Sequence, residues 1–438
     1  MVIFITLVAI IVVAFFVLSR KEKPPKSQNN RLNTGTIDDK NIKIVHVTDI
    51  HYLSPSLTDY GKSFVETIEK SDGKMMRYID QIMDAFVLEM IRTKPDLVIV
   101  SGDMTYNGEK ESHIGLANKF KLLKDKGIKV LVLPGNHDLE NERALAFEGD
   151  ATRPVETVTI EEFEEIYKDY GYGKDDPDVV SRDKKSLNYV YQLGNKCHLI
   201  MVETSTKGND QTISNSSYRW IEKWLRKAKD MNMRVIGVSH QNILAHNKLF
   251  IAGYKITNSS RLVDLYNKYN VRINLSGHMH IQHMAEHKRV HDIALACLGL
   301  YPNLYGVLDM DLRNNMTYHT ESLDVAYWMK KYKHQDSDLL DFENTSREYF
   351  VRCTRLQTEK QLAKLDLSKE DKEMMMDFMV DTNIHYFSGS LDKRPDLSLD
   401  NPAYKLWMDH CERTFTGSYL NSIYTDTISD HNRLEIFQ

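Results

Sequence analysis

The sequence predicts a layered α/β fold in which buried strands alternate with amphipathic helices. Short β-branched runs, such as 42–47 (IKIVHV) and 97–100 (LVIV), are separated by stretches with apolar residues at helical spacing, such as 78–92. Apolar runs of this length are typical of strands buried on both faces, and the helical stretches between them indicate crossover connections. The chain is 42% hydrophobic and 27% charged, which are ordinary values for a globular protein.

Length, charge and cysteine count exclude several classes of protein. The 438 residues suffice for one large domain or two to three ordinary ones. The net charge is −5, whereas proteins that bind nucleic acid through a basic face carry an excess of positive charge, so this class is not indicated. Four cysteines are too few for a dense disulfide scaffold, and the absence of a CxxC pair excludes a zinc finger or an iron–sulfur cluster built on local cysteines.

The N-terminus reads as a membrane segment followed by a tether. Residues 2–18 contain a single polar side chain, Thr6, and basic residues follow at Arg20, Lys21 and Lys23. This length fits a short membrane helix, and the lack of an A-x-A-like cleavage site favours an uncleaved anchor over a removed signal. We therefore expect a transmembrane anchor or signal segment at 1–19 and a polar, flexible tether at 20–40.

The side of the membrane has two interpretations. The basic residues after the apolar segment, taken by the positive-inside rule, leave the body of the protein in the cytoplasm. An apolar N-terminal segment is, however, commonly an export signal. We expect a membrane-anchored protein whose body is extracytoplasmic, with the cytoplasmic face as the alternative.

Strands and helices alternate along the body of the chain, which we place at 41–321. Predicted strands are 42–47, 97–100, 130–133, 235–238 and 271–275, and a strand pair at 189–193 and 197–202 is joined by Gly194-Asn195. Predicted helices are 78–92, 114–126 and 220–230.

Residues 322–438 predict a second, mostly helical domain. Residues 337–365 contain few helix breakers. Ser368 and Asp371 resemble a capping box that opens a helix over 371–381, and Asn401-Pro402 fits the start of a helix over 403–413. Four methionines in this domain predict a packing surface and not a cofactor site: Met374, Met375, Met376 and Met379.

Five strand-like runs each end in residues that can bind a metal. The clusters are Asp49-Ile50-His51, Gly102-Asp103, Gly135-Asn136-His137-Asp138, Ser239-His240 and Gly277-His278-Met279-His280. Residues i and i+2 of an extended segment point the same way, so each D-x-H or H-x-H pair can present two ligands to one spot. Ligands of open α/β sheets lie beyond the carboxyl ends of the strands, where these clusters sit.

The ligand chemistry fits two divalent cations. An aspartate can bridge two ions, an asparagine adds a neutral oxygen, and several imidazoles select Mn, Fe, Co, Ni or Zn over Mg or Ca. Two ions about 3.5–4 Å apart can bind both oxygens of an in-line displacement and activate a water. Each cluster alone is common in structural turns, but the full ordered set predicts a phosphoester hydrolase.

The order of these motifs resembles that of the calcineurin-like metallophosphoesterases. The resemblance covers residues 42–320 and includes D-x-H, G-D, G-N-H-D, a later His and G-H-x-H. The resemblance implies a β-sandwich flanked by helices, with a two-metal site at one end. It implies that Asp103 bridges the two ions. The remaining ligands would be Asp49, His51 and His280 at one ion, and Asn136, His240 and His278 at the other.

The resemblance also assigns two catalytic roles. A hydroxide that bridges the metals would attack phosphorus, and His137 would donate a proton to the leaving group or stabilise its charge. Asp138 would orient the His137 imidazole. The chain departs from the commonest family form after His240, where Gln241 and Asn242 follow instead of a second histidine.

Within the family, residues 147–150, 159–172 and 186–190 are similar to bacterial enzymes related to class III cyclic nucleotide phosphodiesterases. Some of those enzymes also carry an N-terminal export or anchor segment and a C-terminal helical domain. We expect an enzyme that hydrolyses small phosphodiesters or phosphomonoesters with two transition-metal ions, of which Mn, Fe and Zn fit best.

Three alternatives remain. Tyr106, three residues after Asp103, stands where purple acid phosphatases place a metal-binding tyrosine, but His51 argues for the other ligand set. A nuclease or nucleotidase acting on larger substrates is the second alternative, against which the mild acidity argues. The third is a non-catalytic binding scaffold, although such scaffolds normally lose ligands and this chain keeps all seven.

Overall fold

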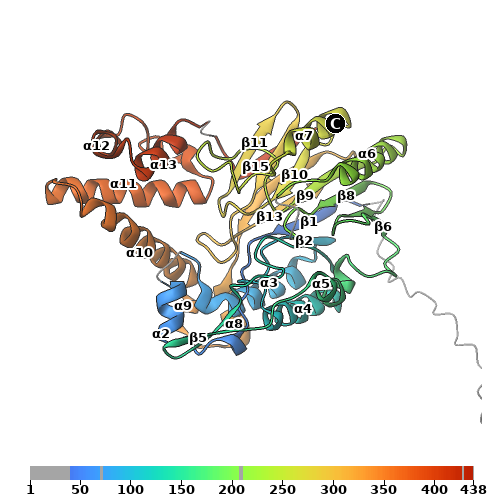
Figure 1. Cartoon of the computed structure of the whole chain (residues 1–438), viewed down its shortest axis with the longest axis horizontal. Coiled ribbons are helices and arrows are strands. Elements are labelled where there is room, and N and C mark those ends of the chain that lie inside the picture. The colour runs from blue at the N-terminus through green and yellow to red at the C-terminus, as the bar shows by residue number, and fades with distance from the viewer. Residues whose placement is uncertain (1–39, 70–72, 207–210, 427–428, 438) are drawn as a thin grey trace, which may run out of the picture. The chain divides into compact units, whose positions relative to one another are not determined.

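The computed structural model describes residues 40–69, 73–206, 211–426 and 429–437. The predicted membrane segment at 1–19, and the predicted tether up to residue 39, lie outside the described residues. Within the described ranges, no helix is both long and apolar enough to cross a membrane. The predicted mixed α/β fold with a helical C-terminal region is confirmed (Figure 1).

The first large sheet holds three of the predicted strands side by side. Its strand order is β15-β14-β13-β1-β2-β3, and β1, β2 and β3 run parallel. The strands are β1 Ile42–Val47, β2 Leu97–Ser101, β3 Lys129–Leu133, β13 Leu304–Met310, β14 Met316–Ser322 and β15 Arg433–Ile436. The carboxyl ends of β1 to β3 therefore meet at one edge.

The second large sheet holds the other predicted strands. Its order is β11-β12-β10-β9-β8-β7-β6, with β8, β9, β10 and β12 parallel. The strands are β6 Val179–Arg182, β7 Tyr189–Leu193, β8 Cys197–Val202, β9 Arg234–Ser239, β10 Ile273–Ser276, β11 His283–His287 and β12 Val290–Ala294. The predicted antiparallel pair of β7 and β8 is confirmed.

The two sheets form the inner layers and helices form the outer ones. In β8, Leu199 and Met201 belong to the core shared with the first sheet, whereas Ile200 and Val202 pack in a separate core with α6 and α7. This alternation follows from the period of two along a strand. Helices α3, α4 and α5 lie on the opposite side of the molecule from α6 and α7 (Figure 1).

The helices that cover the sheets are α3 Ile79–Thr93, α4 Lys110–Lys124, α5 Ile160–Ile166, α6 Asn215–Asp230, α7 Ser259–Lys268 and α8 Val325–Tyr332. Helix α3 buries Ile79, Ile82, Met83, Phe86 and Met90, which recur at the spacing of one helical face. Helix α4 begins four residues before the predicted start, because its first turn is polar and shows no apolar periodicity.

The C-terminal region contains α9 Ser337–Leu340, α10 Phe342–Leu362, α11 Lys369–Phe387, α12 Pro402–Cys411 and α13 Phe415–Tyr424. The predicted caps are confirmed. Ser368 Oγ accepts a hydrogen bond from the Asp371 amide, and Asn401 Oδ1 accepts one from Ala403, with Pro402 in the first turn of α12. Met375, Met376 and Met379 are buried in the helical core, whereas Met374 is 40% exposed and does not belong to it.

Several strands lack a counterpart in the sequence prediction. They include the hairpin of β4 Leu145–Glu148 and β5 Ala151–Pro154, and the strand β15, which follows the C-terminal helices and pairs with β14. β15 is short and reads RLEI, with Arg433 and Glu435 pointing to solvent. Its four residues are too few to stand out as a periodic pattern.

Candidate metal centre

All seven predicted ligands follow the carboxyl ends of parallel strands. Asp49 and His51 follow β1, Asp103 follows β2 and Asn136 follows β3, all in the first sheet. In the second sheet, one ligand follows β9 and two follow β10, namely His240, His278 and His280. The structure therefore brings the loops of both sheets together at one end of the sandwich.

One group of potential ligands consists of Asp49, His51, Asp103 and His280. One ligand atom from each of these residues lies within 4.8 Å of all the others. His51 Nε2 and His280 Nε2 are 3.0 Å apart, and His280 Nε2 is 3.2 Å from Asp49 Oδ1. Asp49, His51 and Asp103 are buried, so their nitrogens and oxygens converge away from solvent.

A second group consists of Asp103, His240 and His278, again within 4.8 Å of one another. His240 Nε2 is 3.2 Å from Asp103 Oδ1 and 3.2 Å from His278 Nδ1. The amide oxygen of Asn136 is 3.1 Å from the same His240 nitrogen and extends the group to four residues. Asp103 belongs to both groups.

The donor set fits two divalent cations. Asp49 Oδ1 is buried, and its nearest polar group in the centre is His280 Nε2 at 3.2 Å, itself a potential ligand atom. Two carboxylates buried this close together need positive charge beside them, and imidazole–carboxylate sets of this kind suit transition metals. The residues present therefore fit the two-metal centre that the sequence predicts.

The backbone at these residues is strained. The φ angles are 51° at Asp49, 50° at His51, 46° at Asp103, 70° at His278 and 57° at His280. Non-glycine residues adopt this left-handed region rarely, and such strain clusters at functional sites. The predicted pairs do converge, but through left-handed turns and not through the extended i, i+2 geometry that we expected.

Two glycines allow the loops to approach closely. A Cβ at Gly135 would collide with the backbone nitrogen and Oδ1 of Asp103, and a Cβ at Gly277 would collide with Thr48 Oγ1 and Asp49 Oδ2. These positions require the absence of a side chain because a ligand carboxylate occupies the space.

Hydrogen bonds orient the imidazoles. His240 Nδ1 lies 2.9 Å from the Ser101 carbonyl oxygen, and His278 Nε2 lies 2.9 Å from the Gly253 carbonyl oxygen. A carbonyl accepts, so each of these nitrogens carries the proton, which leaves His240 Nε2 and His278 Nδ1 to bind a cation. Asp49 Oδ2 accepts from Thr48 Oγ1 and from the His278 amide, both at 2.9 Å.

The charges of the site are balanced between carboxylates and imidazoles. Burial alone would raise the pKa of Asp103, but the His240 and His137 imidazoles outweigh it and hold the pKa well below its usual value. Burial alone would lower the pKa of His240, yet the Asp103 and Asp49 carboxylates raise it to about 9. The carboxylates thus favour positive charge at His240, which a metal ion supplies equally well.

The imidazoles of His51 and His278 are held neutral. Burial, reinforced by the positive charge of Lys74, holds the pKa of His51 well below its usual value. Burial and the neighbouring His240 lower the pKa of His278 to about 4. A neutral imidazole is the form that binds a metal. The sequence prediction missed Lys74, because a single buried lysine outside the five clusters carries no signal.

His137 lies beside the ligands but belongs to neither group. Its Nε2 is 3.9 Å from Asp103 Oδ2, and its Nδ1 is 2.7 Å from the Tyr106 carbonyl oxygen and 3.0 Å from Asn107 Oδ1. These acceptors place the Nδ1 proton on the far side and direct Nε2 toward the site. Its side chain is 24% exposed, so solvent can reach it.

The predicted role of Asp138 is wrong. Its Oδ1 accepts from the Thr105 amide and hydroxyl, both at 2.9 Å, and its Oδ2 accepts from the Gly135 and Met104 amides at 2.8 and 3.2 Å. Asp138 thus ties the loop after β3 to the loop after β2. Tyr106 and Asn107 orient His137 instead. The sequence could not reveal this contact, because the acceptor in Tyr106 is its backbone carbonyl and not its side chain.

Three further residues from the sequence motifs lie near the ligands. The Tyr106 ring packs against Phe147 with centroids 6.3 Å apart. Gln241 and Asn242, which follow His240, are buried. Asn242 Nδ2 donates to Ser276 Oγ and to the Gly277 carbonyl at 2.9 and 3.1 Å, so it braces the loop that carries His278.

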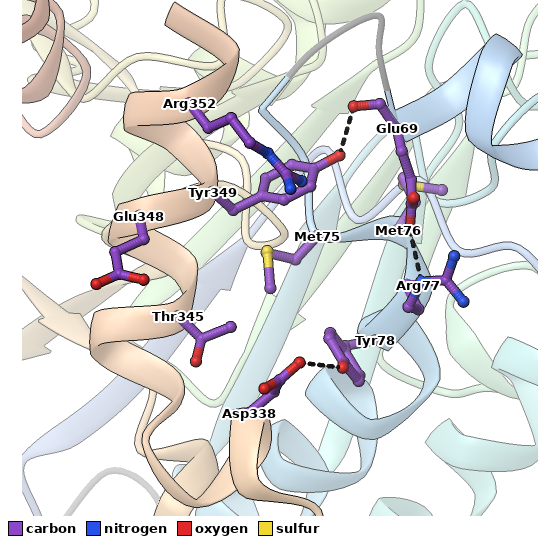
Figure 2. Close-up of a pocket in the computed structure, with 10 residues that line it drawn as sticks. All are labelled: Glu69, Met75, Met76, Arg77, Tyr78, Asp338, Thr345, Glu348, Tyr349 and Arg352. Carbon is purple, nitrogen blue, oxygen red and sulfur yellow. Dashed lines mark hydrogen bonds and ion pairs between the residues drawn. The ribbon is translucent and has the colours of Figure 1, made fainter. Parts of the chain in front are cut away.

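A large cavity of about 530 Å³ lies apart from these ligands, none of which lines it (Figure 2). It lies between Glu69 and residues 75–78 on one side and the helices α9 and α10 on the other. Glu69 Oε1 accepts from Arg77 Nε at 2.6 Å, and Tyr78 donates to Asp338 Oδ2 at 2.8 Å. This cavity brings together no group of potential metal ligands among the described residues, so the metal centre is the better candidate for chemistry.

The site contains two overlapping sets of imidazole and carboxylate ligands, which lie at the ends of strands from both sheets. Such a site is typical of two-metal hydrolases. Residues 42–282 match the calcineurin-like phosphoesterase family, and the chain belongs to this family. It is a metal-dependent hydrolase of phosphoesters with a site for two divalent metal ions. Residues 324–430 match the C-terminal domain of cyclic nucleotide phosphodiesterase.

Curated relatives and solved structures resemble this chain at low identity. A probable glycerophosphodiester phosphodiesterase of Arcobacter nitrofigilis is 23% identical over 300 residues, covering 66% of this chain and 89% of the relative. A probable cyclic nucleotide phosphodiesterase of Xenorhabdus bovienii is 23% identical over 255 residues, covering 57% and 83%. A dimetal phosphatase from Danio rerio aligns with 12% identity and a TM-score of 0.46, covering 64% of this chain and 96% of that one.

Proposed function

We propose that this protein hydrolyses small phosphodiesters at the metal centre. The main support is that Asp103 belongs to both ligand groups. A carboxylate shared by two ions holds them close enough to act together on one phosphate. A diester is favoured over a monoester by the names of the two curated relatives, both of which are called phosphodiesterases.

The ligands divide into two sets in this proposal. Asp103 is common to both, Asp49, His51 and His280 complete one set, and Asn136, His240 and His278 complete the other. When bound, the two ions neutralise phosphate charge and activate the attacking water. The chain's own residues hold the ions in place and exclude bulk water from the buried side of the site.

His137 serves as the proton donor to the leaving oxygen. The Tyr106 carbonyl and Asn107 accept from Nδ1, and acceptors at that nitrogen stabilise the ring when Nε2 also carries a proton. Nε2 faces the site from outside both ligand groups, so it is free to reach the departing alkoxide.

The protein is anchored in a membrane by residues 1–19 and holds its catalytic part on the extracytoplasmic side. The apolar run at 2–18 and the basic residues after it support this part of the proposal. Protease added to intact cells tests the topology. Cleavage of the body is expected, and complete protection until lysis would place it in the cytoplasm.

The activity is tested with bis-p-nitrophenyl phosphate and p-nitrophenyl phosphate in the presence of Mn²⁺. The diester is expected to be the better substrate, and Asp103→Ala is expected to abolish turnover and most bound metal. Asp400→Ala is the matched control, since the Asp400 side chain is 98% exposed and far along the chain from the ligands. No turnover of either ester by the metal-loaded wild type would refute the proposal.

A further inference from the structure

A second cavity, of about 360 Å³, lies where the C-terminal helices meet the loops of the metal centre. Ligand pockets typically begin at about 300 Å³, so this cavity can hold a small organic group. The catalytic part contributes Met279, which lies between the ligands His278 and His280, together with Ile281 and the loop residues Phe250 and Tyr254. Helices α10, α11 and α13 contribute the remaining walls.

A row of aromatic rings connects this cavity to the metal centre. The Tyr254 ring lies 5.3 Å from the His278 imidazole, and the Phe250 ring lies 5.2 Å from Tyr254. Phe250 in turn lies 6.1 Å from Phe415 and 6.3 Å from Tyr419, both on α13. A group held among these rings would adjoin a phosphate at the metals.

The cavity is uncharged. Its lining combines aromatic rings with the amide side chains of Gln357, Gln361 and Asn383, and none of the described lining residues is acidic, basic or a histidine. The cavity of Figure 2 differs, because arginines and carboxylates line it. Phosphate itself therefore belongs at the metals, and the uncharged cavity suits the organic part of a substrate.

Two amides are available to such a group. Tyr419 donates to Asn383 Oδ1 at 2.8 Å, and the Asn383 amide nitrogen makes no hydrogen bond to another described residue. The side chain of Gln361 likewise has no hydrogen-bond partner within the described ranges and is exposed. Stacking surfaces beside amide donors and acceptors are what a planar ring with polar edges requires.

One aromatic wall of the cavity is open to solvent. Phe415 lines the cavity and is 66% exposed. An exposed aromatic ring that lines a pocket leaves a face on which a ligand can stack.

We propose that this cavity binds a planar, uncharged heteroaromatic ring of the substrate while its phosphate lies at the metal centre. The inference rests on the proposed function. It gives the C-terminal helices a role, since they supply the residues that select the substrate's organic group. A glycerol ester, which has no ring to stack, would leave the cavity unfilled.

Calorimetric titration of the Mn²⁺-loaded full chain with adenosine 5′-monophosphate and with ribose 5-phosphate tests this. The two probes share the ribose and the 5′-phosphate, and the second carries an anomeric hydroxyl where the first carries the ring. Phosphate release is followed in parallel so that only intact ligand is scored. We expect the ring-bearing probe to bind about tenfold more tightly, a typical effect of base–aromatic stacking. Equal dissociation constants for the wild type would overturn the inference.

Two variants test whether the aromatic rings of the cavity cause the preference for the ring-bearing probe. Phe415→Ala removes a ring at the mouth, and Phe250→Leu keeps an apolar side chain without the ring, so neither change threatens the core. Each is expected to reduce the tenfold preference to about twofold, as expected when one stacking surface is lost. Leu356→Ala, at a residue 45% exposed on α10 outside the cavity, should keep the full preference.

The outcomes separate this inference from the proposed function. A wild type that hydrolyses diesters but binds both probes equally would refute the cavity's role alone. A wild type that prefers the ring-bearing probe but hydrolyses no diester would refute the activity alone. A preference that survives in both ring variants would also overturn the inference.

Discussion

Both carboxylate oxygens of Asp103 contact neighbouring groups of the metal centre. Oδ1 accepts from the His137 amide at 2.9 Å and lies 3.2 Å from His240 Nε2, while Oδ2 lies 3.9 Å from His51 Nε2. This single side chain therefore faces ligands from both sheets. At the residue scale, the metal centre depends on such shared contacts and on the glycines that leave room for them.

Gly277→Ala tests the close approach of the loops. The added methyl group would collide with Thr48 and Asp49, so the Asp49 carboxylate must move. We expect loss of at least one of the two metals, measured by elemental analysis. Gly127→Ala is the control: its φ of 77° makes the change locally strained, but nothing lies within 4 Å of its Cβ position, so it should keep both metals. Full metal content in Gly277→Ala would contradict this account.

His137→Ala tests the proton donor. Because His137 belongs to neither ligand group, both metals should remain. Loss of a general acid typically slows turnover by about 10²–10⁴-fold, and phenyl esters should suffer more than p-nitrophenyl esters, whose leaving group needs no proton. His287→Ala, at an exposed histidine, is the matched control. A variant that loses its metals would show that His137 is a ligand.

At the element scale, α4 begins at a buried carboxyl group. Glu109 is the residue before α4, it is fully buried, and its backbone carbonyl accepts from the His113 amide. It lies two residues after Asn107, which orients His137. Burial, only partly offset by nearby backbone amides, raises the pKa of Glu109 to about 7.

Glu109→Gln tests the effect of this carboxyl group on stability. The folded pKa lies above the unfolded value of 4.5, so the folded state holds the proton more tightly and stability falls as the pH rises from about 4.5 to 7. The loss is on the order of 3 kcal/mol above pH 7. In urea unfolding, the variant should lose less stability than the wild type across this range.

The control for this measurement is Glu111→Gln, at an exposed residue in the first turn of the same helix. It should follow the wild-type pH dependence. If Glu109→Gln and Glu111→Gln behave alike, burial of the Glu109 carboxyl group does not control stability in this range.

At the scale of the whole molecule, the C-terminal helices share a core with the loops of the catalytic part. The same apolar cluster contains Trp407 and Met375 from the helices and Ile281, Cys297 and Leu300 from the segments after β10 and β12. Cys297 Sγ also donates to the Asp49 carbonyl at 2.9 Å. The helical core is therefore continuous with the backbone of a ligand.

Trp407→Ala tests this continuity. Trp407 is fully buried and donates from Nε1 to the Met375 carbonyl at 2.9 Å, so the change should cost about 3–5 kcal/mol. We expect helix melting and metal release to shift together to lower temperature, followed by circular dichroism and a metal indicator. Metal release at the wild-type temperature, after the helices have melted, would show that the two parts unfold independently.

The extent to which sequence predicted this molecule can be judged at particular residues. The strand 42–47 and the helix caps at Ser368 and Asn401 depend on local chemistry, and they were correctly predicted. The strand β15 and the partners of Asp138 were not, because both depend on residues distant in the chain. The aromatic cavity was also missed, since its walls come from segments as distant in the chain as Phe250 and Tyr419.

The sequence by itself determined the family and its chemistry, because the ligand types and their order after β-branched runs are written locally along the chain. The tertiary structure decided how the ligands converge, through left-handed turns at five of them, and which groups orient His137. It also decided that the C-terminal helices adjoin the metal centre. The physical reason is that ligand identity is a property of single residues, whereas convergence and cavities arise only when distant segments pack together.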